Sequence, residues 1–130
     1  MGLAGIYDLG ALVKEYPQYR SFVEAAFGGV GAQLETRPWD HASPAKNLAC
    51  NSCNRGIDIG YRMVLMRTTR DELLSGRQTE LMGRAIGQRL VVGGLLETVV
   101  GDFGRHSEML RNGRVWEVLE GVVREALNVM

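Results

Sequence analysis

The sequence has little of what several protein classes require. Only two of its 130 residues are cysteine, three are proline, and 7% are aromatic. Fifteen basic residues are balanced by fifteen acidic ones, so no net charge attracts the chain to nucleic acid or to acidic lipid. No apolar run approaches the roughly 20 residues that cross a bilayer, and the start lacks the positive region of a secretory signal. We therefore expect a cytoplasmic protein without a membrane partner.

The composition that remains is typical of a single globular domain. Hydrophobic residues account for 45% of the chain and charged residues for 23%. A chain of this length can bury a sizeable core. We expect residues 1–130 to form one helical domain.

Apolar residues recur at helical spacing along most of the chain. Residues 57–66 are ambiguous, because they alternate like a strand and also fit a helix. We favour a helix there, since no partner strands are evident elsewhere. Thr69 and Glu72 match a capping box, which predicts that a helix begins beside them. The expected helices cover residues 6–16, 17–35, 57–66 and 74–103, together with the segment that follows Asn112. In the range 74–103, Gly93-Gly94 is a candidate bend or close-contact point.

Residues 36–56 are the expected long loop, and they contain both cysteines. The predicted fold is therefore an all-α bundle of four to five helices with one long cysteine-containing loop. Loops of this length are uncommon in compact domains and are often functional. The stretch "DHASPAKNLACNSCNRG", residues 40–56, is accordingly where a site is first sought.

The candidate metal ligands are His41, Cys50 and Cys53. Two thiolates separated by two residues lie on one turn and can reach a single zinc ion, and His41 is near enough in sequence to be a third ligand. A closed structural site needs a fourth ligand, which Asp40, His106 or a second chain would supply. Zinc is the cofactor that this pattern suggests, and otherwise we expect none.

The same stretch resembles HNH-type nucleases in the order of its residues. The resemblance implies that His41 is a general base, that Asn54 and Asp40 bind a catalytic metal, and that the cysteines hold a structural zinc. It covers seventeen of the 130 residues, with shorter gaps than that family has and without its upstream cysteine pair. The matching residues are Asp40-His41, Pro44, Asn47-Leu48, Cys50, Cys53 and Asn54.

Two further interpretations of the cysteine pair stay open. A Cys-x-x-Cys motif at a helix start lowers the pKa of its thiols, which suits a redox switch. Thioredoxin-like proteins place a cis-proline after this motif, whereas all three prolines here precede it. Buried cysteines that pack as small apolar groups beside turn-forming asparagines would give the same pattern.

Arg70, Arg77 and Arg84 recur every seven residues and would line one helical face, where phosphate could bind. Glu80 lies three and four residues from Arg77 and Arg84, well placed to pair with both. No aromatic residue alternates with these arginines, as a single-strand binding groove would require. We expect a solvated, salt-bridged face and regard nucleic acid as the less favoured partner.

Outside the resemblance to HNH-type nucleases, nothing in the sequence assigns a catalytic residue. His106 has no nucleophile-elbow pattern near it, so we interpret it as a surface or capping residue. Trp39 and Trp116 are interpreted as core or interface anchors. We predict a non-catalytic subunit, not an enzyme, whose apolar helices associate with other copies or dock in a larger complex. The alternatives are a metal-dependent nuclease and a thiol redox switch.

Overall fold

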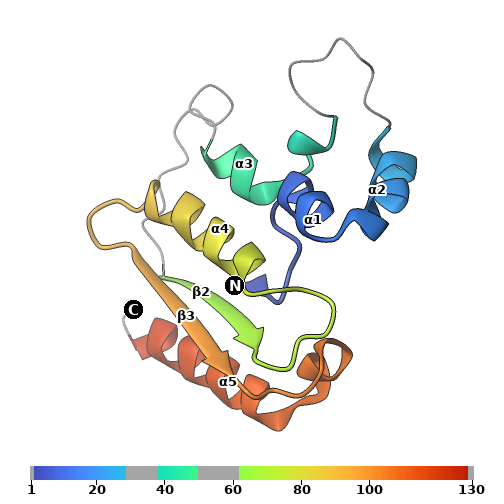
Figure 1. Cartoon of the computed structure of the whole chain (residues 1–130). Coiled ribbons are helices and arrows are strands. Elements are labelled where there is room, and N and C mark those ends of the chain that lie inside the picture. Colours follow the sequence, from blue (N-terminus) through green and yellow to red (C-terminus); the bar gives the residue numbers. More distant parts are fainter. Residues whose placement is uncertain (1, 29–37, 50–61, 129–130) are drawn as a thin grey trace.

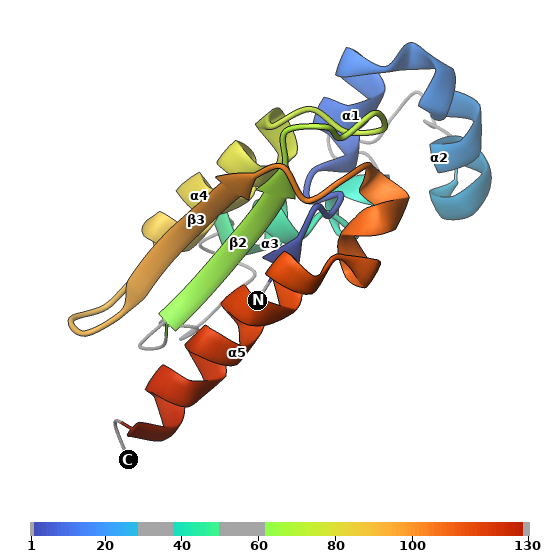
Figure 2. The same ribbon diagram turned by 90° about the horizontal axis from the view of Figure 1, so that it is seen from below.

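The computed structural model describes residues 2–28, 38–49 and 62–128, which form a parallel sheet with helices on both faces (Figure 1). The strands are β1 (Gly2–Leu3), β2 (Arg62–Thr68) and β3 (Leu95–Gly101), in that order. Helix α4 (Arg77–Gly87) covers one face of the sheet, and α5 (Gly113–Asn128) covers the other (Figure 2). The predicted all-α bundle is therefore wrong.

Strand β2 is buried from both sides. Leu65 packs with Ala85 and Ile86 of α4, whereas Val64 and Met66 belong to the cluster formed with α5. A strand covered on both faces is apolar at successive positions and loses the alternation that marks a half-exposed strand. The helix predicted for residues 57–66 is wrong over its described part, residues 62–66.

The long helix predicted for residues 74–103 is wrong as well. Helix α4 ends at Gly87, and β3 follows a turn in which Gly93 has a φ of 90°, a conformation that favours glycine. The apolar repeat thus belongs to two elements that lie on opposite sides of this turn. The capping box expected at Thr69 and Glu72 is also absent, because α4 begins only at Arg77.

Two of the predicted helices are confirmed. Helix α1 (Leu9–Glu15) lies within the predicted range and begins at Asp8, whose Oδ1 accepts the N–H of Ala11 at 2.8 Å. Helix α5 follows Asn112, as expected. Pro17 begins a short 3-10 turn, η1 (Pro17–Tyr19), that leads into α2 (Arg20–Phe27), and the rest of the predicted range 17–35 lies outside the described residues.

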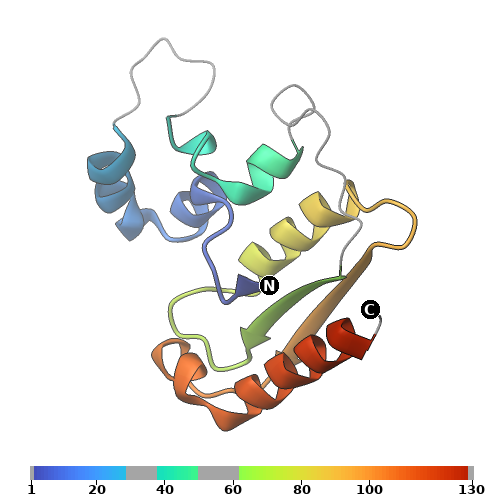
Figure 3. The ribbon, with the colours of Figure 1, turned by 180° about the vertical axis from the view of Figure 1, so that it is seen from behind.

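The described part of the predicted loop 36–56 is largely helical. It forms the 3-10 turn η2 (Pro38–Asp40) and helix α3 (Pro44–Ala49). Trp39 is fully buried in η2 among apolar residues of α1 and α2. Figure 3 shows these elements on the α4 side of the sheet. Among the described residues, no helix combines the length and the apolarity that crossing a membrane requires.

Candidate active site

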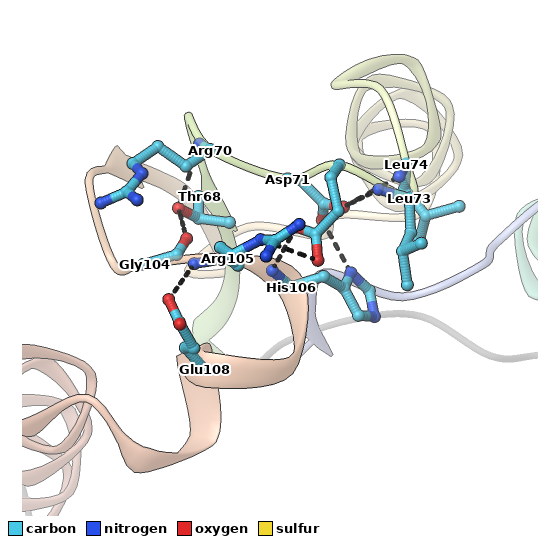
Figure 4. A network of polar contacts seen from close by, with 10 residues as sticks. Thr68, Arg70, Asp71, Leu73, Leu74, Gly104, Arg105, His106 and Glu108 are labelled. Atoms are coloured by element: carbon cyan, nitrogen blue, oxygen red, sulfur yellow. Dashed lines mark hydrogen bonds and ion pairs between the residues drawn. The ribbon is translucent and has the colours of Figure 1, made fainter.

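An aspartate and a histidine meet where the two longer strands end. Asp71 follows β2, and His106 follows β3 and begins the 3-10 helix η3 (His106–Arg111). Carboxyl ends of parallel strands meet at one edge of a sheet, where α/β proteins place their ligands. The Nδ1 atom of His106 lies 2.8 Å from Oδ2 of Asp71 (Figure 4). The Asp71 side chain is 7% exposed and that of His106 is 29% exposed, so the pair is partly shielded from water.

The Asp71 carboxylate is held in place by the main chain that follows it. Its Oδ1 accepts the N–H of Leu73 at 3.0 Å and that of Leu74 at 2.8 Å. The other oxygen, Oδ2, is thereby directed to His106. A carboxylate in this position fixes which imidazole nitrogen carries the proton, since Nδ1 donates to it. The Nε2 atom is then the nitrogen that can accept a proton from another group.

Thr68, the last residue of β2, joins the two loops that carry the pair. Its hydroxyl donates to the carbonyl of Gly104 at 2.6 Å. The same oxygen accepts the N–H groups of Phe103 and Arg70, each at 3.2 Å. Gly104 has a φ of 84°, which a residue with a side chain rarely adopts, and this turn directs the chain toward His106.

His106 is one of the residues that line a cavity of about 410 Å³. This volume falls within the range of roughly 300 to 1,000 Å³ that is usual for small-molecule sites. Apart from His106, the wall is mainly aliphatic and aromatic, so the cavity suits an apolar or aromatic group beside a reactive base. The lining residues are Ala4, Gly5, Ile6, Leu9, Leu12, Tyr19, Phe22, Leu73, Leu74 and His106.

One side of this cavity is fixed by Gln78, a buried residue of α4. Its Oε1 accepts the N–H groups of Tyr7 and Asp8 at 2.9 and 2.8 Å, and its Nε2 donates to the carbonyl of Asp8 at 3.1 Å. These bonds hold the connection between β1 and α1. That connection supplies residues 4–6 to the cavity wall.

The predicted metal site is only partly covered by the structure. His41 is exposed, and its carbonyl accepts the Nδ2 group of Asn47 at 2.5 Å. Asp40 pairs with Lys46 at 2.5 Å. Cys50 and Cys53 lie outside the described residues, within which no group of three potential metal ligands occurs. The zinc site at His41, Cys50 and Cys53 stays a prediction.

The three arginines do not share one helical face. Arg77 and Arg84 are exposed on α4, where they line a small polar cavity with Glu80. Arg70 lies before that helix and is 3.8 Å from Asp102, which follows β3. Binding of nucleic acid through these residues stays an untested prediction.

The sequence interpretation did not identify Asp71 and His106 as partners. They are 35 residues apart, and their contact depends on two strands that were predicted as helices. A signal was nevertheless present: Asp71 follows the apolar run 62–68 by three residues, and His106 follows the run 95–101 by five. Two such runs, each followed by a titratable residue, indicate a shared edge once the strands are recognised as parallel neighbours.

Curated relatives of this chain are enzymes, and more specifically hydrolases. They are named kynurenine formamidase. The protein from Meyerozyma guilliermondii is 31% identical over 121 residues, which cover 93% of this chain and 42% of the relative. The proteins from Debaryomyces hansenii and Scheffersomyces stipitis are each 30% identical over 88% of this chain, and 40% and 39% of their own lengths are covered. The chain thus spans about two fifths of the length of these relatives. No protein-family model matches it.

These relatives correct the functional predictions made from the sequence. A non-catalytic assembly subunit is the wrong class, because the similar proteins are named as an enzyme. The nuclease and the thiol redox switch are wrong for the same reason, since a formamidase is neither.

Proposed function

We propose that this chain forms the acid–base side of a hydrolase site that cleaves a formamide, with the N-formyl derivative of kynurenine as substrate. The observation that carries the proposal is the 2.8 Å contact between Asp71 and His106 at the wall of a cavity of about 410 Å³. The name of the relatives supports the choice of bond and substrate.

In this proposal His106 is the general base and Asp71 orients it. Hydrolases that use a Ser-His-Asp set take a proton from the nucleophile onto Nε2, while the aspartate stabilises the imidazolium that forms. In α/β hydrolases the aspartate precedes the histidine in the chain, as Asp71 precedes His106. The positions of both residues after neighbouring parallel strands agree with this arrangement.

The proposed reaction proceeds in two balanced steps. A hydroxyl oxygen attacks the formyl carbon as His106 takes its proton, and the C–N bond breaks as His106 returns that proton to the departing amine. Water then attacks the formyl ester with His106 again as base, which releases formate and restores the hydroxyl. The sum is one formamide and one water giving one amine and one formate.

The described residues that line the cavity include no serine, threonine or cysteine, and the one hydroxyl among them is the phenol of Tyr19. In α/β hydrolases the nucleophile precedes the aspartate in the chain. We therefore expect the nucleophile outside this described lining and before Asp71 in the polypeptide.

A chimera tests this function directly. The 121 matched residues of this chain replace the corresponding segment of the Meyerozyma guilliermondii enzyme, and formate release from N-formylkynurenine is measured. We expect turnover by the chimera, and none by the same enzyme with the segment deleted. A chimera that folds, as judged by circular dichroism and by molar mass, but that releases no formate would contradict the proposal.

The aromatic ring of the substrate should lie against Phe22. This side chain lines the cavity and is 67% exposed, so a bound ring can cover it. Contacts between aromatic rings contribute about 0.5 to 1.5 kcal/mol beyond the buried area. For Phe22→Ala in the chimera we expect KM to rise about two- to tenfold, with kcat little changed.

Phe27 is the matched control for this measurement. It lies on the same helix and is 41% exposed, but it does not line the cavity. Phe27→Ala should leave KM within about twofold of the parent chimera, as surface substitutions usually do. Equal changes in KM for the two variants would show that Phe22 has no specific contact with the substrate.

A further inference from the structure

Two consecutive carboxylates hold the same histidine at two different points. Asp71 Oδ2 lies 2.8 Å from the ring nitrogen Nδ1 of His106. Glu72 Oε2 accepts the main-chain N–H of His106 at 2.9 Å. Figure 4 shows the contact between Asp71 and His106, which joins the loop that follows β2 to the loop that follows β3. The mechanism proposed above uses Asp71 and leaves Glu72 without a role.

The second oxygen of Glu72 contacts the residue before the histidine. Its Oε1 lies 3.5 Å from Nε of Arg105. The N–H of His106 lowers the pKa of Glu72 most strongly, and the charge of Arg105 lowers it further. The carboxylate is therefore ionised in neutral solution, and an ionised acceptor forms the stronger hydrogen bond.

Glu108 makes a similar bond that is local to η3. Its Oε2 accepts the N–H of Arg105 at 2.7 Å, three residues earlier in the chain. Both bonds satisfy main-chain N–H groups at the start of η3, which have no partner within the helix. They differ in reach: Glu108 binds its own segment, whereas Glu72 joins segments 34 residues apart. Glu108 is therefore a matched control for Glu72.

We infer that Glu72 is a positioning residue: it anchors the main chain of His106 so that the imidazole stays against Asp71. Asp71 can fix the ring only if the main chain of His106 stays at a constant distance from the end of β2. Thr68 ties the preceding residues, Phe103 and Gly104, and Glu72 extends that tie to His106 itself. The inference rests on the proposed function only where it explains why the ring has to be fixed.

The ring nitrogens of His106 give a readout that does not require activity. In alkaline buffer an ordinary imidazole is neutral, and the ¹⁵N shifts of its two nitrogens report which one carries the proton. The chain has two histidines, and the exposed His41 serves as the internal reference. In the unmodified 130-residue chain we expect the proton of His106 on Nδ1, where it donates to Asp71.

Glu72→Ala should release the ring. We expect the share of neutral His106 with its proton on Nε2 to rise at least about threefold, because Nδ1 no longer stays opposite Asp71. Glu72→Gln keeps an acceptor oxygen and should restore most of the original distribution, whereas Glu108→Ala should leave it unchanged. In the chimera, Glu72→Ala should lower kcat about tenfold with KM within about twofold, as expected for a misplaced base.

Several outcomes would overturn the inference. Unchanged ¹⁵N shifts of His106 in Glu72→Ala would show that the ring is held without Glu72. An equal change in Glu108→Ala would assign the effect to fraying of η3 instead. If Glu72→Ala does not fold, the test passes to Glu72→Gln. A folded Glu72→Gln in which the proton of His106 is distributed differently between Nδ1 and Nε2 would count against the role of the acceptor oxygen. An inactive chimera would refute the proposed function and leave the ¹⁵N result standing.

Discussion

Replacing His106 with alanine in the chimera should lower the rate of formate release by about 10⁶-fold. The imidazole both accepts the proton of the nucleophile and donates it to the departing amine, so its loss removes acid and base catalysis together. The side chain makes one described polar contact, to Asp71, and it lines an open cavity. The variant should therefore fold, and the loss should appear in kcat measured with saturating substrate.

The second histidine of the chain provides the control. His41 lies in the turn before α3, is exposed, and contacts Asn47 through its carbonyl rather than through its ring. His41→Ala should leave the rate within about twofold, since surface substitutions of this kind change little. Similar rates for the parent and His106→Ala would refute the assignment of the base.

Asp71→Asn tests the orienting role of the carboxylate with almost no change in volume. An amide that keeps its oxygen toward the N–H groups of Leu73 and Leu74 presents its NH₂ to the ring. Nδ1 must then accept, and the proton moves to Nε2, where the base is needed. This tautomer costs about 10⁴-fold in a Ser-His-Asp hydrolase, and we expect a loss of that order in formate release.

Trp39→Ala should have the largest effect on stability. Its side chain is 0% exposed and packs with Leu9, Leu12, Val13 and Val23. Replacing a buried tryptophan with alanine typically costs about 3 to 5 kcal/mol, because apolar contacts are lost and a cavity remains. Unfolding in urea, followed by circular dichroism, should show this decrease in the free energy of unfolding.

Trp116 is the control for the tryptophan substitution. It is 56% exposed on α5, and its indole N–H donates to the carbonyl of Leu110 at 3.1 Å. Trp116→Ala should cost at most about 1 kcal/mol, the usual net contribution of one hydrogen bond. If both substitutions cost the same, Trp39 does not organise the α1–α2 region as its burial indicates.

The sequence pattern predicts elements that bury one face, but it does not predict a strand that is buried on both faces. Helices α1 and α5 each bury one apolar stripe, α1 against α2 and η2 and α5 against the sheet, so the period of each is readable. Val64, Leu65 and Met66 are all buried, which removes the period of β2. Residues 95–101 then look like the end of the preceding helix, because their partner strand is not recognised.

The candidate site could not be predicted for a related reason. Asp71 and His106 resemble ordinary surface residues until β2 and β3 are placed side by side. The candidate site was instead predicted in residues 40–56, because the histidine and the cysteines there are close in sequence. A metal or redox pair can be recognised from local spacing, whereas an acid–base pair assembled from two strand ends depends on the fold.

The pairing of β2 with β3 also determines where the chain can change length. The strands are in register from Arg62 opposite Leu95 to Thr68 opposite Gly101. One residue advances a strand by about 3.3 Å, more than the length of a hydrogen bond. A single insertion between 68 and 71, or between 101 and 106, would thus separate the carboxylate from the imidazole. Insertions in the turn near Gly93, at the opposite end of β3, would leave both where they are, so natural length variation should concentrate there.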